Sequence, residues 1–140
     1  MTDNPAEAPP ERSRSAANLA AAGVRLLAGT DTMTGYVFPG FSLHDELGLL
    51  TDAGLSPLDA LRAATIEPAR HLGLAHRQGS VEEGMAADLV LLDADPLTDI
   101  GHTRQIRAVI ARGRVFDRVE LDRLLAGVRS AVAVPAERGA

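Results

Sequence analysis

The sequence predicts an α/β fold, on the evidence of two changes in its residue pattern. The Ala-rich, helix-favouring stretch "SAANLAAAG" runs through Gly23 directly into the short apolar run "VRLLAG". A helix that is joined to a buried strand by a tight glycine turn is typical of an α/β unit. From about Gln78 onward, capped helical segments give way to apolar runs separated by glycine turns, which are typical of β-strands.

The composition restricts the classes of function. The chain has 140 residues, of which 46% are hydrophobic and 24% charged, as in ordinary globular proteins. A net charge of −5 and an aromatic content of 3% disfavour a nucleic-acid or anionic-membrane partner. The absence of cysteine excludes disulfides, thiolate ligands and a cysteine nucleophile. With no signal core and no run long enough to span a bilayer, we expect a cytoplasmic location.

Two helices in the first half carry their own boundary signals. The segment "SLHDELGLLTDAG" is predicted to begin with Ser42 as N-cap and Asp45 at the capping-box position, and to end at Gly54. The segment "SPLDALRAAT" repeats the pattern, with Ser56 as N-cap and Pro57 at the first helical position. In the first segment, Leu43, Leu47 and Leu50 share one face. In the second, Leu58, Leu61 and the alanines give a small-residue face that is expected to pack closely.

The rest of the chain predicts one short helix, a β region and a final helix. The helix "PARHLG" is expected to run from Pro68 to Gly73. A brief strand is expected before Gly84, then the strand "ADLVLLD", whose apolar faces call for neighbours on both sides. In "IRAVIARGRVF", Gly113 is predicted to form a tight turn that reverses the strand. Asp117 then caps the helix "DRVELDRLLAGV".

These elements divide the chain into four segments. Residues 1–14 are polar and Pro-rich and are expected to be disordered, and residues 15–76 form the α/β part. Residues 77–116 form the β part, and residues 117–140 a C-terminal helix and tail. One strand near the start cannot make a sheet alone, so we expect this chain to be the end of something larger.

Four ordered blocks of the sequence resemble the C-terminal part of the amidohydrolase superfamily, especially its imidazolonepropionase-like and prolidase-like members. The blocks are "AGVRLLAGTD", "SLHDELGLLTDAGLSPLDALRAATIEPARHLGL", "GSVEEGMAADLVLLDADPLTDI" and "IRAVIARGRVFDRVELDRLL", and residues 84–93 are especially characteristic. The resemblance runs from about Ala16 to about Leu125. It implies that residues 15–76 are the last strand and following helices of a TIM-type (β/α)8 barrel. It also implies that residues 77–116 are strands of a small β-sandwich, the composite domain.

Asp31 is the candidate catalytic and metal-binding residue. From the residues alone, a lone aspartate after an apolar run is usually a turn former, because its carboxylate bonds nearby backbone N–H groups. The resemblance implies instead that Asp31 ends the eighth barrel strand and ligates a divalent metal, usually zinc. It would take the proton of the metal-bound water that attacks the carbonyl carbon, and pass it to the leaving nitrogen. The expected reaction is hydrolysis of a C–N bond in a non-peptide amide or dipeptide-like substrate.

His44 is the candidate substrate-binding residue. Several relatives carry a histidine on the first turn of this helix, which implies a substrate-facing role. An exposed polar residue near a helix start is an equally good interpretation, so both stay open. The other histidines, His71, His76 and His102, are expected at the surface, and the acidic residues around the strand "ADLVLLD" are expected to form turns.

The remaining ligands of the implied metal site have no counterpart in this sequence. The family carries a His-x-His pair, a lysine and further histidines on earlier strands. This chain has no lysine, and all four of its histidines follow Asp31. Because a zinc site normally takes at least three protein ligands, we expect the chain alone to be inactive. It would need the N-terminal part or a partner chain. The alternative is a non-catalytic remnant or an interaction module that needs a partner chain.

Overall fold

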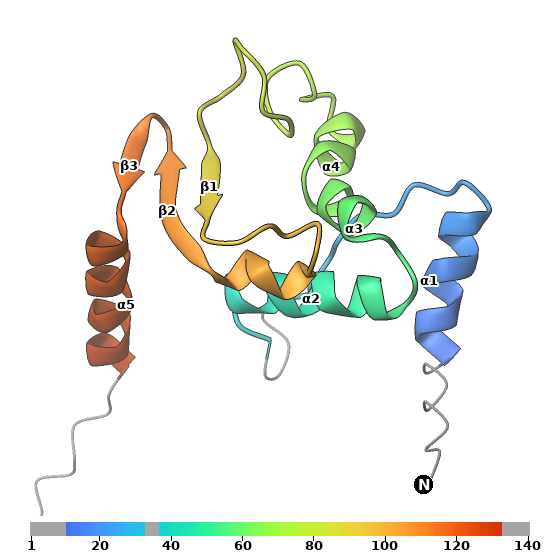
Figure 1. The fold of residues 1–140 in the computed structure, drawn as a ribbon, viewed down its shortest axis with the longest axis horizontal. Helices are drawn as coiled ribbons and strands as arrows, with labels where there is room; N and C mark the ends of the chain where they lie inside the picture. Colours follow the sequence, from blue (N-terminus) through green and yellow to red (C-terminus); the bar gives the residue numbers. More distant parts are fainter. Residues whose placement is uncertain (1–10, 33–36, 133–140) are drawn as a thin grey trace, which may run out of the picture.

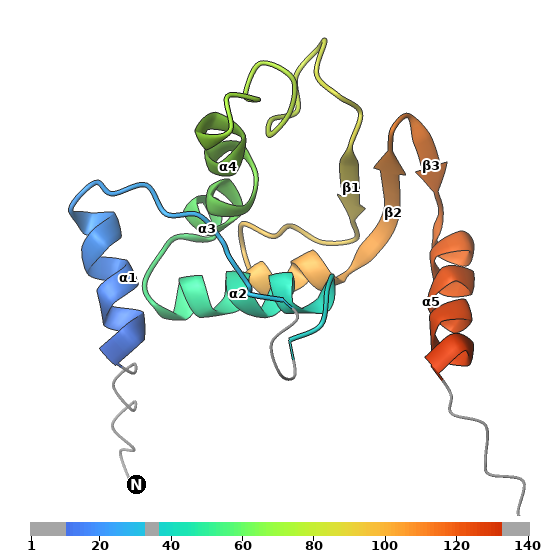
Figure 2. The same cartoon turned by 180° about the vertical axis from the view of Figure 1, so that it is seen from behind.

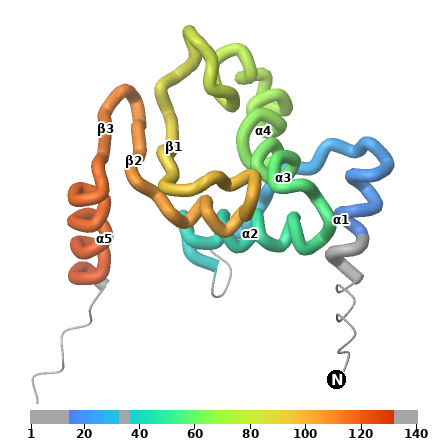
Figure 3. The backbone as a smooth tube through the Cα atoms, in the orientation of Figure 1, coloured from blue at the N-terminus to red at the C-terminus, as the bar shows by residue number. Residues whose placement is uncertain are grey.

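The computed structural model describes residues 11–32 and 37–132 and confirms the α/β class, with helices beside a small antiparallel sheet (Figure 1). In Figure 3, α1 and α5 lie at opposite ends of the described chain, with the other helices and the sheet between them. The elements in chain order are α1 (Glu11–Ala21), α2 (Phe41–Asp52), α3 (Pro57–Ala64), α4 (Ile66–His71), β1 (Leu89–Leu92), the 3-10 helix η1 (Ile100–Arg104), β2 (Ile106–Ala111), β3 (Arg114–Phe116) and α5 (Arg118–Val132).

The core lies between α2 and α3. Its buried residues combine three leucines with two alanines of α3: Leu47, Leu50, Leu55, Ala60 and Ala63. Ala60 is 0% exposed, and so small a side chain allows the two helix backbones to approach closely. The close packing predicted for the alanines of α3 is therefore confirmed, whereas Leu58, predicted on the same face, is 44% exposed.

The predicted cap of α3 is confirmed. Ser56 Oγ accepts a hydrogen bond from the Asp59 backbone N–H at 3.1 Å and donates to Asp59 Oδ2 at 2.6 Å, with Pro57 at the start of the helix. This arrangement pairs one of the N–H groups that a helix leaves without a partner. The Ser56 hydroxyl, and after it the Arg62 guanidinium, lower the pKa of the Asp59 carboxyl.

The predicted cap of α2 is wrong. The helix begins one residue before Ser42, at Phe41, and Gly40 occupies the N-cap position with φ 85°. Ser42 Oγ instead donates to the Phe38 carbonyl at 2.8 Å. Asp45 is not part of a capping box either, because its carboxylate forms an ion pair with Arg104. A distant arginine therefore competes successfully with the local backbone for this carboxylate.

Two other helices begin earlier than expected. The first, α1, starts at Glu11 rather than Ser15, and α4 starts at Ile66 rather than Pro68. Pro68 falls in the first turn of α4, where its missing N–H leaves no helical hydrogen bond unmade. The predicted helix ends are confirmed at Gly54 and Gly73, whose φ angles of 103° and 72° suit glycine.

The predicted strand at residues 24–29 does not form. This stretch is irregular and crosses α2 and α3 as a single run of chain (Figure 2). Val24 N–H bonds back to the Leu19 carbonyl of α1 at 3.0 Å. The bonds from this stretch to α3 and α2 are Ala28 N–H to the Ala63 carbonyl at 2.9 Å and Gly29 N–H to Glu46 Oε1 at 3.3 Å. A strand requires a neighbouring strand, and none of the described residues supplies one here. The brief strand expected before Gly84 is likewise absent.

The three strands form one antiparallel sheet in the order β1-β2-β3. Ala111 pairs with Arg114, so Arg112 and Gly113 make a two-residue turn, with φ angles of 52° and 77°. Two positive φ angles define the type I′ turn, whose twist matches that of paired strands. The tight turn predicted at Gly113 is confirmed.

The neighbours that the apolar strand β1 calls for are incomplete among the described residues. This strand is an edge strand paired with β2 alone, and Val90 and Leu91 are 56% and 53% exposed. Val115 on β3 is 60% exposed, and α5 exposes Leu124 and Val128 in the same way. The described residues thus form one sheet with apolar surface, and the expected β-sandwich stays a prediction.

Substitution of Gly79 tests whether the loop after α4 packs closely against that helix. A Cβ at Gly79 would lie 2.9 Å from Ile66 Cα and 2.9 Å from Ala69 Cβ, and φ there is 101°. We expect Gly79→Ala to lower the free energy of unfolding by more than about 1 kcal/mol, because close contact and left-handed backbone both penalise it. Urea unfolding followed by circular dichroism measures the change.

Gly127→Ala is the matched control for this prediction. Gly127 lies within α5, and a Cβ there meets no atom within 4 Å. We expect this change to leave stability unaltered or raise it by roughly 0.5–1 kcal/mol, as alanine does inside a helix. Equal effects of the two substitutions would show that the loop is not packed as described.

Candidate active site

Asp31 lies exposed at the end of the irregular segment that crosses the core. The segment is held to α3 by the bond from Ala28 to Ala63 and to α2 by the bond from Gly29 to Glu46. The backbone of Asp31 has φ 49°, a left-handed conformation that aspartate tolerates better than most residues. This geometry agrees with a turn, and the residue is exposed.

His44 lies half-buried on the first turn of α2. Its Nδ1 is 3.0 Å from the hydroxyl of Thr103, a buried residue of η1. Burial and the positive charge of Arg104 lower the pKa of the imidazole, against a smaller opposing effect of Asp45. His44 is therefore held in its neutral form, and its contact with a substrate stays a prediction.

A second contact joins the same two elements. Arg104 of η1 forms an ion pair with Asp45 of α2, with Nη2 and Oδ1 2.5 Å apart. Together with the contact from His44 to Thr103, it fastens the first turn of α2 to a segment 59 residues further along the chain. Sequence analysis missed both Thr103 and Arg104. No local pattern marks them, since both partners lie in short segments far apart in sequence.

The described residues do not form a metal site. Within residues 11–32 and 37–132, no three histidine, aspartate or glutamate side chains gather as they would around a metal ion. His71 and His76 are exposed, and His102 donates from Nδ1 to the Asp95 carbonyl at 2.8 Å. Asp31 therefore supplies at most one ligand, and the described part of this chain does not fit a divalent metal by itself.

The acidic residues around β1 have structural partners, as predicted. Each carboxylate accepts a hydrogen bond from nearby backbone or from an arginine side chain, which is the usual chemistry of strand ends and turns. The pairs are Asp88 with the Arg112 N–H, Asp93 with the Arg107 guanidinium, Asp95 with the Leu97 N–H and Asp99 with the Gly101 N–H.

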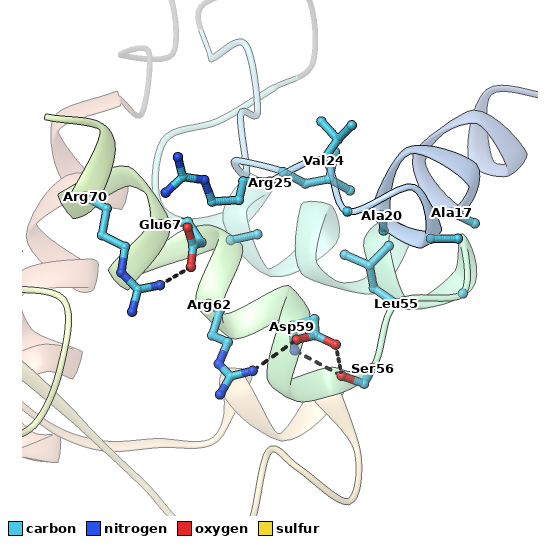
Figure 4. A pocket seen from close by; sticks show the side chains of 15 residues that line it. Ala17, Ala20, Val24, Arg25, Leu55, Ser56, Asp59, Arg62, Glu67 and Arg70 are labelled. Atoms are coloured by element: carbon cyan, nitrogen blue, oxygen red, sulfur yellow. Dashed lines mark hydrogen bonds and ion pairs between the residues drawn. The ribbon is translucent and has the colours of Figure 1, made fainter.

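A groove of about 720 Å³ lies between α1, the irregular segment, α3 and α4 (Figure 4). Small side chains such as Ala17 and Ala20 line one wall, and an ion pair between Arg70 and Glu67 lies on another. Glu67 Oε2 is buried with no hydrogen-bond partner among the described residues. Neither Asp31 nor His44 lines this groove, so it is separate from the candidate active site.

Comparison with known proteins places the chain in a family. The sequence model of the Amidohydrolase family matches residues 5–116, which is most of the chain. N-acetylglucosamine-6-phosphate deacetylase of Bos taurus is 39% identical over 94 residues, which are 67% of this chain and 20% of that protein. Imidazolonepropionase of Thermoplasma volcanium is 39% identical over 72 residues, 49% of this chain and 18% of that protein. The chain belongs to the amidohydrolase family.

Solved structures agree with this assignment. Bottromycin amidohydrolase has a TM-score of 0.72 and 34% identity, and the match covers 87% of this chain and 26% of that one. A Xaa-Pro dipeptidase with methionine bound in its active site has a TM-score of 0.67 and 28% identity, over 75% of this chain and 25% of that one. The expected likeness to imidazolonepropionase-like and prolidase-like proteins is confirmed. The chain spans about a fifth to a quarter of the length of these relatives.

No helix in the described ranges has the length and apolar character needed to cross a membrane.

The lowered pKa of His44 predicts how stability depends on pH. The ordinary pKa of 6.5 applies to the unfolded chain, which therefore binds a proton at a higher pH than the folded chain does. The stability that neutral His44 contributes is fully present above about pH 6.5 and is lost as the pH falls through the lowered pKa of the folded chain. We expect the free energy of unfolding to fall over this window in the wild type, and less steeply in His44→Gln.

Urea titrations at pH values from about 5 to 8 give the slope of the unfolding free energy against pH for each variant. His71→Gln is the matched control, because the His71 side chain is exposed and outside the contact between α2 and η1. A His44→Gln slope identical to that of the wild type would contradict the burial of His44.

Proposed function

We propose that this chain supplies the Asp31-bearing part of a metal-dependent amidohydrolase. The reaction is hydrolysis of a C–N bond in a non-peptide amide or dipeptide-like small molecule. The observation that carries the proposal is the position of Asp31, an exposed residue that lies within the region matched by the family and ends a segment bonded to both core helices. The activity of the whole protein is likewise proposed, since this chain covers only about a fifth to a quarter of the length of its relatives.

Asp31 has two roles in this proposal. Its carboxylate serves as one ligand of a divalent metal, with zinc as the proposed ion, because an ionised carboxylate suits a hard or borderline cation. The same group accepts the proton of the attacking water and delivers it to the leaving nitrogen, as a positioned general base does. No three candidate ligand side chains gather among the described residues, so the proposal takes the other ligands from an N-terminal part or from a partner chain.

His44 is proposed to contact the substrate. The residue lies on the first turn of α2, the helix that follows Asp31 in the chain, and its neutral imidazole can accept one hydrogen bond and donate another. A neutral histidine suits an uncharged amide substrate, because it offers polarity without the cost of desolvating a cation.

The second candidate function is an interaction module without catalysis. It is favoured by the apolar surface of the sheet and of α5, where Val90, Val115 and Val128 are all more than half exposed. Surfaces of this kind mark contact with other polypeptide. On this view, the chain buries these faces against a partner chain, and Asp31 acts as a turn residue.

The chain alone is expected to bind no zinc in stoichiometric amount and to show no amidase activity, because one carboxylate does not hold zinc against dialysis. Metal analysis of the purified 140-residue chain after dialysis against zinc-free buffer measures the outcome. Retention of one zinc per chain would contradict this expectation and would mean that ligands outside the described residues complete a site.

Replacement of the matched quarter of bottromycin amidohydrolase by this chain tests the catalytic proposal directly. The hybrid is expected to hydrolyse the substrate of that enzyme, and Asp31→Asn is expected to lower kcat by at least about 100-fold, the usual contribution of a general base. Asp52→Asn, at an exposed position at the end of α2, is the matched control and should leave kcat unchanged.

The same hybrid separates the two candidate functions. A hybrid that folds but shows no hydrolysis would favour the interaction module. Equal loss of activity in Asp31→Asn and Asp52→Asn would show that Asp31 has no special role.

A further inference from the structure

We propose that Thr103 is a positioning residue that fixes the tautomer of His44. The imidazole then carries its hydrogen on Nδ1 and presents Nε2 as an acceptor for an N–H or O–H group of the substrate. The assignment of the tautomer stands on contacts within the described chain, whereas the contact with substrate rests on the proposed function.

The direction of each hydrogen bond follows from the chemistry of the Thr103 hydroxyl. Its Oγ1 lies 2.8 Å from the Ile100 carbonyl and 3.0 Å from His44 Nδ1. A carbonyl oxygen can only accept, so the single hydroxyl hydrogen is used in the bond to Ile100. Toward His44 the same oxygen can then only accept, and Nδ1 must be the atom that donates.

Because Thr103 is buried, its hydroxyl has few alternatives to these two hydrogen-bond partners. Thr103 is 6% exposed, so water has little access to exchange with either of its two partners. If Nδ1 carried no hydrogen, its lone pair would face an oxygen lone pair at 3.0 Å, because the hydroxyl hydrogen would still be needed by Ile100. An unpaired contact between buried polar atoms is costly, and the Nδ1–H tautomer avoids it.

The neutral imidazole has one hydrogen, so Nδ1–H leaves a lone pair on Nε2. The lowered pKa of His44 keeps this lone pair free of a proton near neutral pH. The titratable groups that face the ring are Arg104 of η1 and Asp45 of α2, and the ion pair between them holds the two elements together. Nε2 is therefore an acceptor that suits the donor groups of an amide.

His102 is a second histidine in the same chain against which the tautomer of His44 can be compared. Its Nδ1 lies 2.8 Å from the Asp95 carbonyl, which can only accept, so His102 must also carry hydrogen on Nδ1. The two histidines therefore share a tautomer for the same reason, although only His44 depends on the Thr103 hydroxyl. A change at Thr103 should alter one ring and leave the other as it was.

Nitrogen-15 NMR of the labelled 140-residue chain near pH 7.5 tests the tautomer, with His44→Gln used to assign the resonance. We expect the Nδ1–H pattern for His44 and His102 in the wild type. Thr103→Val should convert His44 to a mixed pattern and leave His102 unchanged, and Thr103→Ser should restore the wild-type pattern. An Nε2–H pattern for His44 in the wild type would overturn the proposal whether or not the valine variant folds.

The contact with substrate is tested in the hybrid with bottromycin amidohydrolase. Thr103→Val is expected to lower kcat/KM about tenfold or more, Thr103→Ser to recover it, and the double variant with His44→Gln to lose no more than His44→Gln alone. Additive losses would overturn the positioning role. An inactive parent hybrid would refute the proposed function and the contact with substrate, while the NMR result would still decide the tautomer.

Discussion

The packing of α2 against α3 is the constraint on which the rest of the structure depends. Ala60 and Ala63 are almost completely buried, and their small size brings the two helices together around Leu47 and Leu50. The same contact creates the surface that carries the segment before Asp31, since that segment bonds to Ala63 of one helix and Glu46 of the other. A larger side chain at either alanine would separate the helices and displace the candidate catalytic carboxylate with them.

The sequence predicted correctly those helix caps, helix ends and turns that depend on residues within a few positions of one another. The cap at Ser56, the helix ends at Gly54 and Gly73 and the turn at Gly113 all follow from side-chain hydrogen bonding or from backbone angles within a few residues. The features that depend on distant residues were predicted poorly. Asp45 was expected to serve its own helix and pairs with Arg104 instead, and residues 24–29 have strand character without a strand beside them.

The candidate site shows the same division. Asp31 could be selected from its sequence context, because the family blocks on either side determine its position in the chain. Thr103 could not be selected, since its importance arises only when η1 lies against α2 and places a buried hydroxyl beside His44. A histidine acquires a defined tautomer from the partner of its other nitrogen, and that partner can come from any part of the chain.

The sparse hydrogen bonding of residues 25–29 and the lack of a metal-ligand cluster among the described residues have a common explanation in the proposed function. Among the described residues, two backbone N–H groups of residues 25–29 bond to other parts of the chain, those of Ala28 and Gly29, while Val24 and Leu27 are 49% and 43% exposed. Buried backbone groups need partners, so polypeptide that covers this segment must supply hydrogen bonds along it. A covering strand in an amidohydrolase barrel would carry side chains to the same end of the sheet as Asp31, where such barrels place their catalytic groups. In the proposed function, the polypeptide that completes the sheet would therefore also supply the other metal ligands.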